Sequence, residues 1–201
     1  MRIKDKIKRP RRPVVAYEIL PPREKDGTLN SYAENISSLL SQTHIDAINI
    51  PEVRDEVARG ERPIKNQVRA EPREFGRLLQ DIVGIEAIVN RVVVHQNIDE
   101  EMKWLEETNL KYEIENLITV GGESRDIRYP GPTVNQALNA ISQNDSLNLL
   151  CGGISIPSRD RESLRLIKKS ENGSEFFTTQ VLYDASKVIK MITHYQKRCD
   201  D

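Results

Sequence analysis

The sequence lacks the features on which several classes of protein depend. It has only two cysteines in 201 residues, Cys151 and Cys199, and they stand far apart without the spacing of a metal-ligand pair. A disulfide framework and a cysteine-based zinc site are therefore not expected. We predict no metal site, and a reducing cytoplasm is the expected location.

Long apolar runs and a one-sided charge are also missing. No apolar stretch approaches the roughly 18 residues that a membrane-spanning helix needs, and the first residues have no hydrophobic segment typical of a signal peptide. Lysine and arginine number 30 against 31 for aspartate and glutamate, so the net charge is −1. We therefore expect neither a membrane nor a nucleic acid as a partner.

The composition that remains is typical of one globular domain over residues 1–201. Charged residues make up 30% of the chain and hydrophobic residues 37%, which favours a single core with a well-solvated surface. Residues 1–13, MRIKDKIKRPRRP, form a basic N-terminal arm. Such an arm can contact phosphates or an anionic surface. A solvated arm before the first strand is the simpler interpretation, and we give the arm no role in function.

One pattern repeats six times along the chain: a short β-branched apolar run and then an amphipathic helix. Proline ends the first two runs, because proline cannot donate to a strand ladder. Asn97 and Glu100 have the spacing of a capping box at the start of one helix, and Gly84 is placed to end another. The expected strands cover residues 14–20, 45–50, 88–94, 114–120, 147–156 and the run that begins at residue 175.

Strands that alternate with helices imply parallel pairing and right-handed crossovers. Both a (β/α) barrel and an open doubly wound sheet satisfy this rule. The chain has no G-x-G-x-x-G turn after its first strand. In a barrel, the carboxyl ends of all strands meet at one mouth. Polar residues stand at or near these ends on different strands: Glu18, Asn49, His95, Glu123 and Gln180. We therefore predict an α/β fold of the (β/α) TIM-barrel type, shortened to about six βα units.

A count of six units, where a closed barrel has eight, leaves three explanations open. The chain can be a shortened product, it can complete its sheet with a partner, or it can close in an unusual way. An open layer would expose the edges of its outer strands, which invites association. A homo-oligomer or a partner subunit is therefore expected.

Several segments resemble the methylenetetrahydrofolate reductase family. YEILPP is similar to the E-F-F-P-P signature of that family's first strand. GGISIP followed by LIKKSENGSEFFTTQVLYD is similar to its segment of paired lysines, glycine, Phe and Thr-Gln. VVVHQN and TVGGES stand where the family has a strand ending in His-Leu-Thr-Cys and an L-R-G-D turn. The resemblance runs in order over about residues 14–185.

The resemblance implies a (β/α)8 barrel that binds FAD at its mouth. The family passes a hydride from reduced flavin to a methylene-pterin in one-carbon metabolism, and NADH or NADPH reloads the flavin. A folate- or pterin-type small molecule is thus the expected substrate. The reaction requires protonation of the folate amine that leaves the methylene carbon, and a carboxylic acid kept protonated by burial suits that task.

By position, Glu18 matches the family's catalytic glutamate. A charge within an otherwise apolar strand is costly unless it is paired or useful. The structural alternative is a glutamate bonded to a neighbouring lysine in the barrel.

Three further residues match flavin contacts of the family. His95 stands at the end of the third strand, Glu123 stands at the aspartate beside the flavin that also helps to orient folate, and Tyr129 resembles a tyrosine of the following loop. Two departures weaken the FAD assignment: Gly121 replaces an arginine, and Gln-Asn-Ile follows His95. On local grounds the GGES segment can be only a tight turn, and His95 only a hydrogen-bonding residue.

Lys168 and Lys169 match the basic pair with which the family reaches the FAD phosphates. The alternative is a solvated helix face shared with Arg161 and Arg165.

Gln180 matches a family glutamine that meets the substrate, since its amide can both donate to and accept from a pterin or nicotinamide edge. Its alternative is a side chain satisfied by a neighbouring strand. His44 and His194 have no partners at metal spacing, so we treat them as structural.

Two other functions stay open. The lost arginine and the missing last units also suit a non-catalytic or degenerate homologue that serves as a subunit and completes its barrel with a partner. The lysine pair would suit a barrel enzyme with a phosphate-bearing substrate, although phosphate sites in barrels usually draw on the last two loops.

Overall fold

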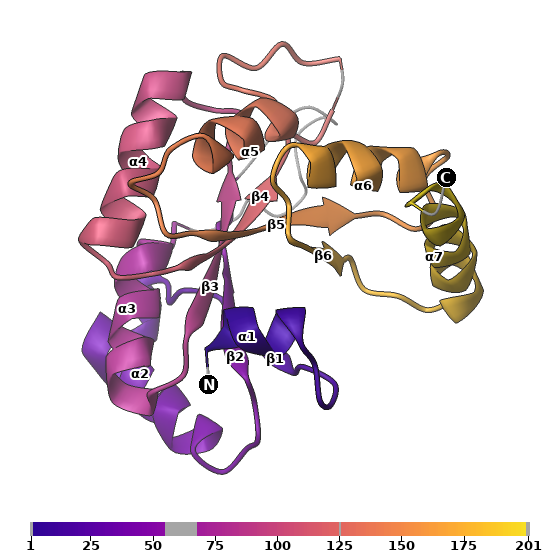
Figure 1. The fold of residues 1–201 in the computed structure, drawn as a ribbon. Helices are drawn as coiled ribbons and strands as arrows, with labels where there is room; N and C mark the ends of the chain where they lie inside the picture. The colour runs from indigo at the N-terminus through magenta and orange to yellow at the C-terminus, as the bar shows by residue number, and fades with distance from the viewer. Residues whose placement is uncertain (1, 55–67, 125, 200–201) are drawn as a thin grey trace.

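The computed structural model describes residues 2–54, 68–124 and 126–199, and its centre is one curled sheet (Figure 1). The six strands are all parallel and lie in chain order, β1 to β6. A doubly wound sheet would reverse its strand order at a switch point, so that alternative is wrong. The strands are β1 Ala16–Glu18, β2 Ala47–Pro51, β3 Ala87–Val92, β4 Asn116–Val120, β5 Leu150–Ser155 and β6 Phe176–Thr179.

The sheet forms a half barrel. Among the described residues, no strand pairs with the outer side of β1 or of β6. The predicted alternation and barrel-like curl are therefore confirmed, but the structure is not a closed barrel. Closure would need further strands between β6 and β1, which the described part of the chain does not supply.

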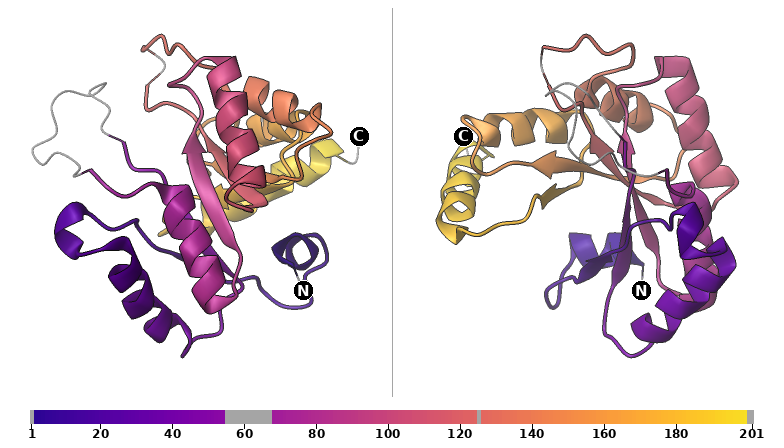
Figure 2. Two further views of the ribbon diagram at one scale, coloured as in Figure 1. Left: turned by 90° about the vertical axis from the view of Figure 1, so that its left-hand side faces the viewer. Right: turned by 180° about the vertical axis from the view of Figure 1, so that it is seen from behind.

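In the described ranges, six helices follow the strands and cover the outer, convex face of the sheet (Figures 1 and 2). Asn97 caps one of them, as predicted, by accepting from the Glu100 amide at 3.0 Å. Gly84 ends another in the left-handed conformation, with φ 71°. No helix in the described ranges is long and apolar enough to cross a membrane. The helices are α2 Leu29–Leu40, α3 Pro72–Val83, α4 Ile98–Leu110, α5 Val134–Ser142, α6 Glu162–Glu171 and α7 Ala185–Cys199, with a short 3-10 turn at Glu24–Asp26.

The N-terminal segment differs from the expected solvated arm, because Ile3–Lys8 form helix α1. Ile3 is only 1% exposed and packs in a cluster with Ile88 and Leu150, whose side chains face the hollow of the sheet. The Ile3 amide donates to the Glu86 carboxylate at 3.0 Å. Helix α1 therefore covers the lower part of the inner face, and basic residues alternate with the apolar ones that anchor it.

Asp46, just before β2, ties this segment to the sheet. Its carboxylate accepts two hydrogen bonds from Arg12, at 2.9 and 2.7 Å, and one from the Val15 amide at 2.9 Å. Lys6 adds an ion pair at 3.0 Å. The Val15 bond, followed by those from Lys6 and Arg12, lowers the pKa of Asp46 to about 2.

The outer face carries most of the apolar core. Ile48 of β2 packs with Phe75 of α3, and Leu117 of β4 packs with Leu138 of α5. Cys151 is buried on this face, and burial raises the pKa of its thiol to about 12. It is therefore not a candidate nucleophile.

Among the described residues, a buried charge network around Arg91 interrupts the apolar outer face. The Arg91 guanidinium, whose residue is 2% exposed, donates to both oxygens of Glu101 at 2.7–3.1 Å and to Glu52 at 3.0 Å. It also donates to Gln96 and lies 4.3 Å from the ring centroid of Trp104. Glu52 accepts in addition from the Val92 amide at 2.8 Å. The network joins the end of β2 to β3 and α4, and so stiffens the sheet just below its mouth.

Candidate functional site at the mouth of the half barrel

The carboxyl ends of the strands meet around the upper inner face, as in barrel enzymes. Parallel pairing places Glu18 opposite Asn49 and Asn90 opposite Pro51. Because side chains alternate along a strand, Glu18, Asn49 and Asn90 point to the inner face, the same side as Ile88. Three neighbouring strands thus supply a polar row.

A hydrogen bond joins the first two members of this row. The Nδ2 of Asn49 donates to the Glu18 carboxylate at 2.9 Å. Glu18 is exposed, so the half barrel does not give it the burial that an acid catalyst requires. Within the described ranges its hydrogen-bond partner is this asparagine, and the lysine of the structural alternative is not seen.

Two oxygen atoms of the row have no donor in the ranges that the structure describes. The Oδ1 atoms of Asn49 and Asn90 are both buried without a hydrogen-bond partner among the described residues. Buried polar atoms in native proteins are usually paired, so such exceptions mark places where a ligand or water completes the bonding. Asn49 was among the polar residues predicted at the strand ends, whereas Asn90 was not. The available signal was an amide within the apolar run IVNRVVV, at the same period-two spacing as Ile88.

The other half of the inner face is apolar. The strand register places Ile118 beside Asn90, then Gly152 and Phe176 in turn. A Cβ at residue 152 would lie 2.5 Å from the Phe176 ring, so glycine is what lets this ring lie against β5. Next to the polar row of Glu18, Asn49 and Asn90, the inner face is thus apolar where Ile118, Gly152 and Phe176 line it.

The structure brings His95 and Tyr129 together from two different loops. Their ring centroids are 5.5 Å apart, with an interplanar angle of 83°. The Tyr129 hydroxyl accepts from the Ser124 amide at 3.5 Å, and its ring fills the space that a Cβ on Gly122 would need, at 2.2 Å. The two glycines before Glu123 therefore do more than make a turn, since one of them makes room for a ring. Glu123 itself is exposed in this loop.

The lysine pair lies on the outer side of the sheet. The Lys169 side chain lies over Gly153, and its Nζ donates to the Ile154 carbonyl. Burial lowers the pKa of Lys169. Lys168 is exposed in a shallow hollow that Thr133 of the α5 N-cap and Asn172 also line. Neither lysine faces the mouth with Glu18. As placed here, the two cations do not fit the phosphates of an FAD bound at the mouth.

Gln180 directly follows β6 and is exposed. It lines a hollow of about 220 Å³ with Pro157, Tyr183 and Lys187, next to the carboxyl ends of β5 and β6. Gln180 is therefore at the mouth, but on the far side of the inner face from Glu18.

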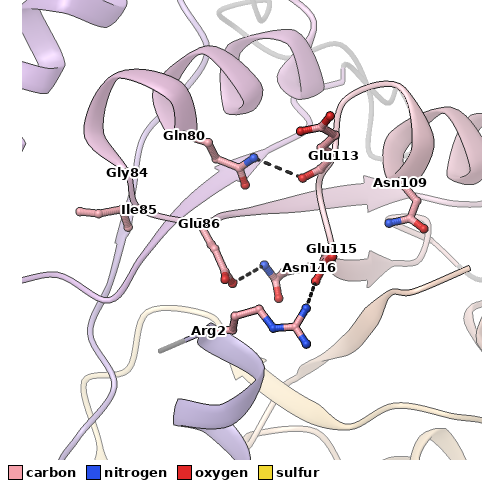
Figure 3. Close-up of a pocket in the computed structure, with 9 residues that line it drawn as sticks. All are labelled: Arg2, Gln80, Gly84, Ile85, Glu86, Asn109, Glu113, Glu115 and Asn116. Atoms are coloured by element: carbon pink, nitrogen blue, oxygen red, sulfur yellow. Dashed lines mark hydrogen bonds and ion pairs between the residues drawn. The ribbon is translucent and has the colours of Figure 1, made fainter.

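A larger hollow of about 460 Å³ lies at the opposite, lower end of the sheet (Figure 3). Its polar side chains already have partners: Arg2 pairs with Glu115 at 2.9 Å, and Asn116 donates to Glu86 at 3.2 Å. In barrel proteins this end serves stability rather than chemistry. Among the described residues, no group of three or more His, Cys, Asp or Glu is placed to hold a metal ion. The mouth therefore remains the candidate site.

Comparison with known proteins supports the fold. No family model and no curated protein matches the chain. An uncharacterized protein from Clostridium thermocellum that binds two copies of 5-methyl-5,6,7,8-tetrahydrofolic acid has a similar structure, with a TM-score of 0.75 and 21% identity over 98% of this chain. The chain covers 65% of that protein, which is less than two thirds of its length.

Two enzymes share the fold more distantly. The 4-hydroxy-tetrahydrodipicolinate synthase of Methylacidiphilum fumariolicum SolV has a TM-score of 0.54 and 19% identity, over 90% of this chain and 58% of its own. A mandelate racemase/muconate lactonizing protein of Paracoccus denitrificans PD1222 has a TM-score of 0.52 and 6% identity, over 92% and 44%. At these identities the likeness establishes a TIM-barrel-like fold.

Proposed function

We propose that the protein binds a folate-type pterin at the mouth of the half barrel and acts on its one-carbon unit. The observation that supports this best is the bonded pair Glu18 and Asn49 on the inner face, where the family resemblance expects an acid. A structure of similar fold binds 5-methyltetrahydrofolate, which supports the same class of ligand.

The finer assignment is a methylenetetrahydrofolate reductase-like flavoprotein. In that reaction the reduced form of FAD would supply the hydride, and NADH or NADPH would then reduce the oxidised flavin again. His95 and Tyr129 would border the flavin ring, and Glu123 is within the same loop region. The phosphates would need cations other than Lys168 and Lys169, which lie on the outer face. This assignment rests on the resemblance.

Within this proposal the chain's own residues have distinct tasks. Glu18 is the proton donor to the amine that leaves the methylene carbon, and Asn49 holds its carboxylate in place through Nδ2. A pterin over the mouth would remove water from Glu18, which strengthens its interactions with the bound ring. Gln180 would meet the ligand from the β6 side.

Two measurements test the proposal. The first is calorimetric titration of the purified protein with 5-methyltetrahydrofolate, for which we expect saturable binding. The second is the visible spectrum before and after addition of FAD, where flavin bands retained through gel filtration would support the flavoprotein assignment. Absence of both bindings would overturn the proposal, and folate binding without flavin would limit it to a pterin-binding protein.

A matched variant separates catalysis from binding. If the reductase assay is positive, Glu18→Gln should lower its rate by about 10²–10⁴-fold, because the amide cannot deliver the proton. Folate affinity should change little, since glutamine keeps the shape and can still pair with Asn49. An undiminished rate would remove Glu18 from the proposed chemistry.

A second candidate function is favoured by the open edges. Tyr17 on β1 is 56% exposed, and beyond β6 Val181 is 78% and Tyr183 is 96% exposed. Apolar side chains along two edges that no described strand pairs with suit a subunit that completes its barrel with a partner or with a second copy. Mass measurement in solution tests this, and a monomer at high concentration would remove the structural reason for it.

A further inference from the structure

The unpaired Oδ1 atoms of Asn49 and Asn90 indicate which hydrogen-bonding groups a ligand of the inner face would carry. Burying an amide oxygen without a donor lowers stability, so a scaffold gains nothing by keeping two on adjacent strands. Both atoms are buried on the inner face, above the cluster in which Ile3 of helix α1 packs with Ile88. A molecule bound over the upper part of this face would supply the missing donors.

Glu18 determines which atom of the Asn49 amide is left without a partner. An asparagine amide can be turned so that its oxygen and nitrogen exchange places. At Asn49 this exchange would set Oδ1 against the carboxylate of Glu18, which accepts from Nδ2 at 2.9 Å. Asn49 consequently keeps Oδ1 as a buried acceptor without a partner in the described part of the chain, and any partner must be a donor.

The surface next to these acceptors suits a flat ring. Ile118 pairs in register with Asn90, and Phe176 follows across Gly152. A ligand with N–H groups along one edge and an apolar face would satisfy both halves of this surface. Pterins have such an edge in the lactam N–H and the neighbouring amino group of their pyrimidine ring, and flavins have the lactam N–H alone.

We propose that the Oδ1 atoms of Asn49 and Asn90 accept hydrogen bonds from the lactam N–H edge of a flat heterocycle whose ring lies toward Ile118 and Phe176. The inference deepens the proposed function and rests on it for the identity of the ring. Asn90 becomes a ligand-binding residue. Asn49 combines two tasks, because it binds the ring and positions Glu18.

A ligand pair tests the donor edge without any mutation. Lumazine carries N–H groups on its pyrimidine ring, and 1,3-dimethyllumazine is the same bicycle with both replaced by methyl groups. We expect lumazine to bind the wild-type protein and the dimethyl compound to bind about tenfold or more weakly. Equal binding of the two would overturn the proposal.

Variants of Asn90 then locate the contact. Asn90→Leu should weaken lumazine by about tenfold or more, whereas Asn90→Asp, which keeps the acceptor oxygens, should retain binding. Asn139→Leu is the matched control, since Asn139 is exposed on α5. Full binding by Asn90→Leu would overturn the proposal, and Asn90→Asp together with the ligand pair decides the matter if the leucine variant does not fold.

The same variants show whether a pterin or a flavin ring donates the hydrogen bonds. Titrations with 5-methyltetrahydrofolate and with riboflavin should show a loss for Asn90→Leu with whichever of them uses the edge. If the wild-type protein binds one or both and no Asn90 variant alters either affinity, this inference fails while the proposed function stands. If the wild type binds neither of them nor lumazine, both fail.

Discussion

Asn90 and Arg91 are consecutive residues of β3, and their side chains leave the strand on opposite faces. Arg91, on the outer face, is fully enclosed and bonded to Glu101, Glu52 and Gln96. Asn90, on the inner face, has a buried oxygen without a donor among the described residues. On the outer face of β3 the polar side chain thus has its hydrogen-bond partners, and on the inner face one side-chain oxygen lacks them.

This contrast distinguishes polar side chains that stabilise the fold from polar side chains that serve a binding site. A buried guanidinium with paired carboxylates belongs to the scaffold, because removing one partner leaves an uncompensated charge. A buried amide without a partner lowers stability, and proteins accept that cost mainly at sites of function. Four sets of unfolding measurements test this contrast.

The largest effect is expected from the outer network. Glu101→Ala should lower the free energy of unfolding by about 3–5 kcal/mol, because Arg91 would stay buried with one carboxylate fewer. Glu100→Ala, one residue earlier and exposed, should change it by less than about 0.5 kcal/mol. Urea unfolding of both variants measures this, and equal midpoints would show that the network does not stabilise the scaffold.

The next effect concerns Asp46, another polar group with all its partners. Asp46→Ala should cost about 2 kcal/mol at neutral pH, since hydrogen bonds to a charged group are lost. The folded-state pKa of about 2 lies below the ordinary 3.8, so this stabilisation is complete above the ordinary value and is lost as the pH falls toward 2. The stability gap between wild type and variant should narrow over that window, and a gap that does not depend on pH would contradict the assigned ion pairs.

The inner face should respond in the opposite direction. Asn90→Leu should leave the free energy of unfolding unchanged or raise it by up to about 1 kcal/mol, because an unpaired oxygen is replaced by an apolar group. Asn116→Leu is the matched control on the same face: its Nδ2 donates to Glu86 and to the Ala87 carbonyl, both at 3.2 Å. This control should be destabilised. A clear loss of stability in Asn90→Leu would mean that Asn90 is a structural residue.

The smallest effects are expected at the lysine pair. Lys168→Ala should alter stability by less than about 0.5 kcal/mol, and Lys169→Ala should cost about 1 kcal/mol through its lost bond to the Ile154 carbonyl. Neither should change flavin retention in gel filtration. A selective loss of FAD in Lys168→Ala would restore the phosphate role that the family resemblance gave to this residue.

Local signals explain what the sequence could predict about the fold. Asn97 and Gly84 act within one helical turn, so their capping roles were readable from spacing alone. The six strands were found because each combines a β-branched apolar run with a proline or glycine boundary. Helix α1 was missed because its apolar anchors, Ile3 and Ile7, stand among basic residues and its stability comes from packing under the sheet.

Less of the candidate site could be predicted from the sequence. Glu18 and Asn49 could be placed at the mouth, since strand ends converge in any barrel-like sheet. The orientation of Lys169 depends on how α6 packs on β5, and no motif encodes that rotation. Asn90 was hidden by the adjacent Arg91, because two polar residues in succession obscure which of them faces inward.

The contact of Gly152 with Phe176 limits which residues can replace either of them during evolution. Any side chain at residue 152 would enter the space of the aromatic ring, at 2.5 Å from a Cβ. The two positions should therefore change together across homologues: where the ring is kept, glycine is kept, and where the glycine is lost, the ring gives way to something smaller. Such paired variation would identify relatives that line the inner face in the same way, even where the acidic and amide residues have diverged.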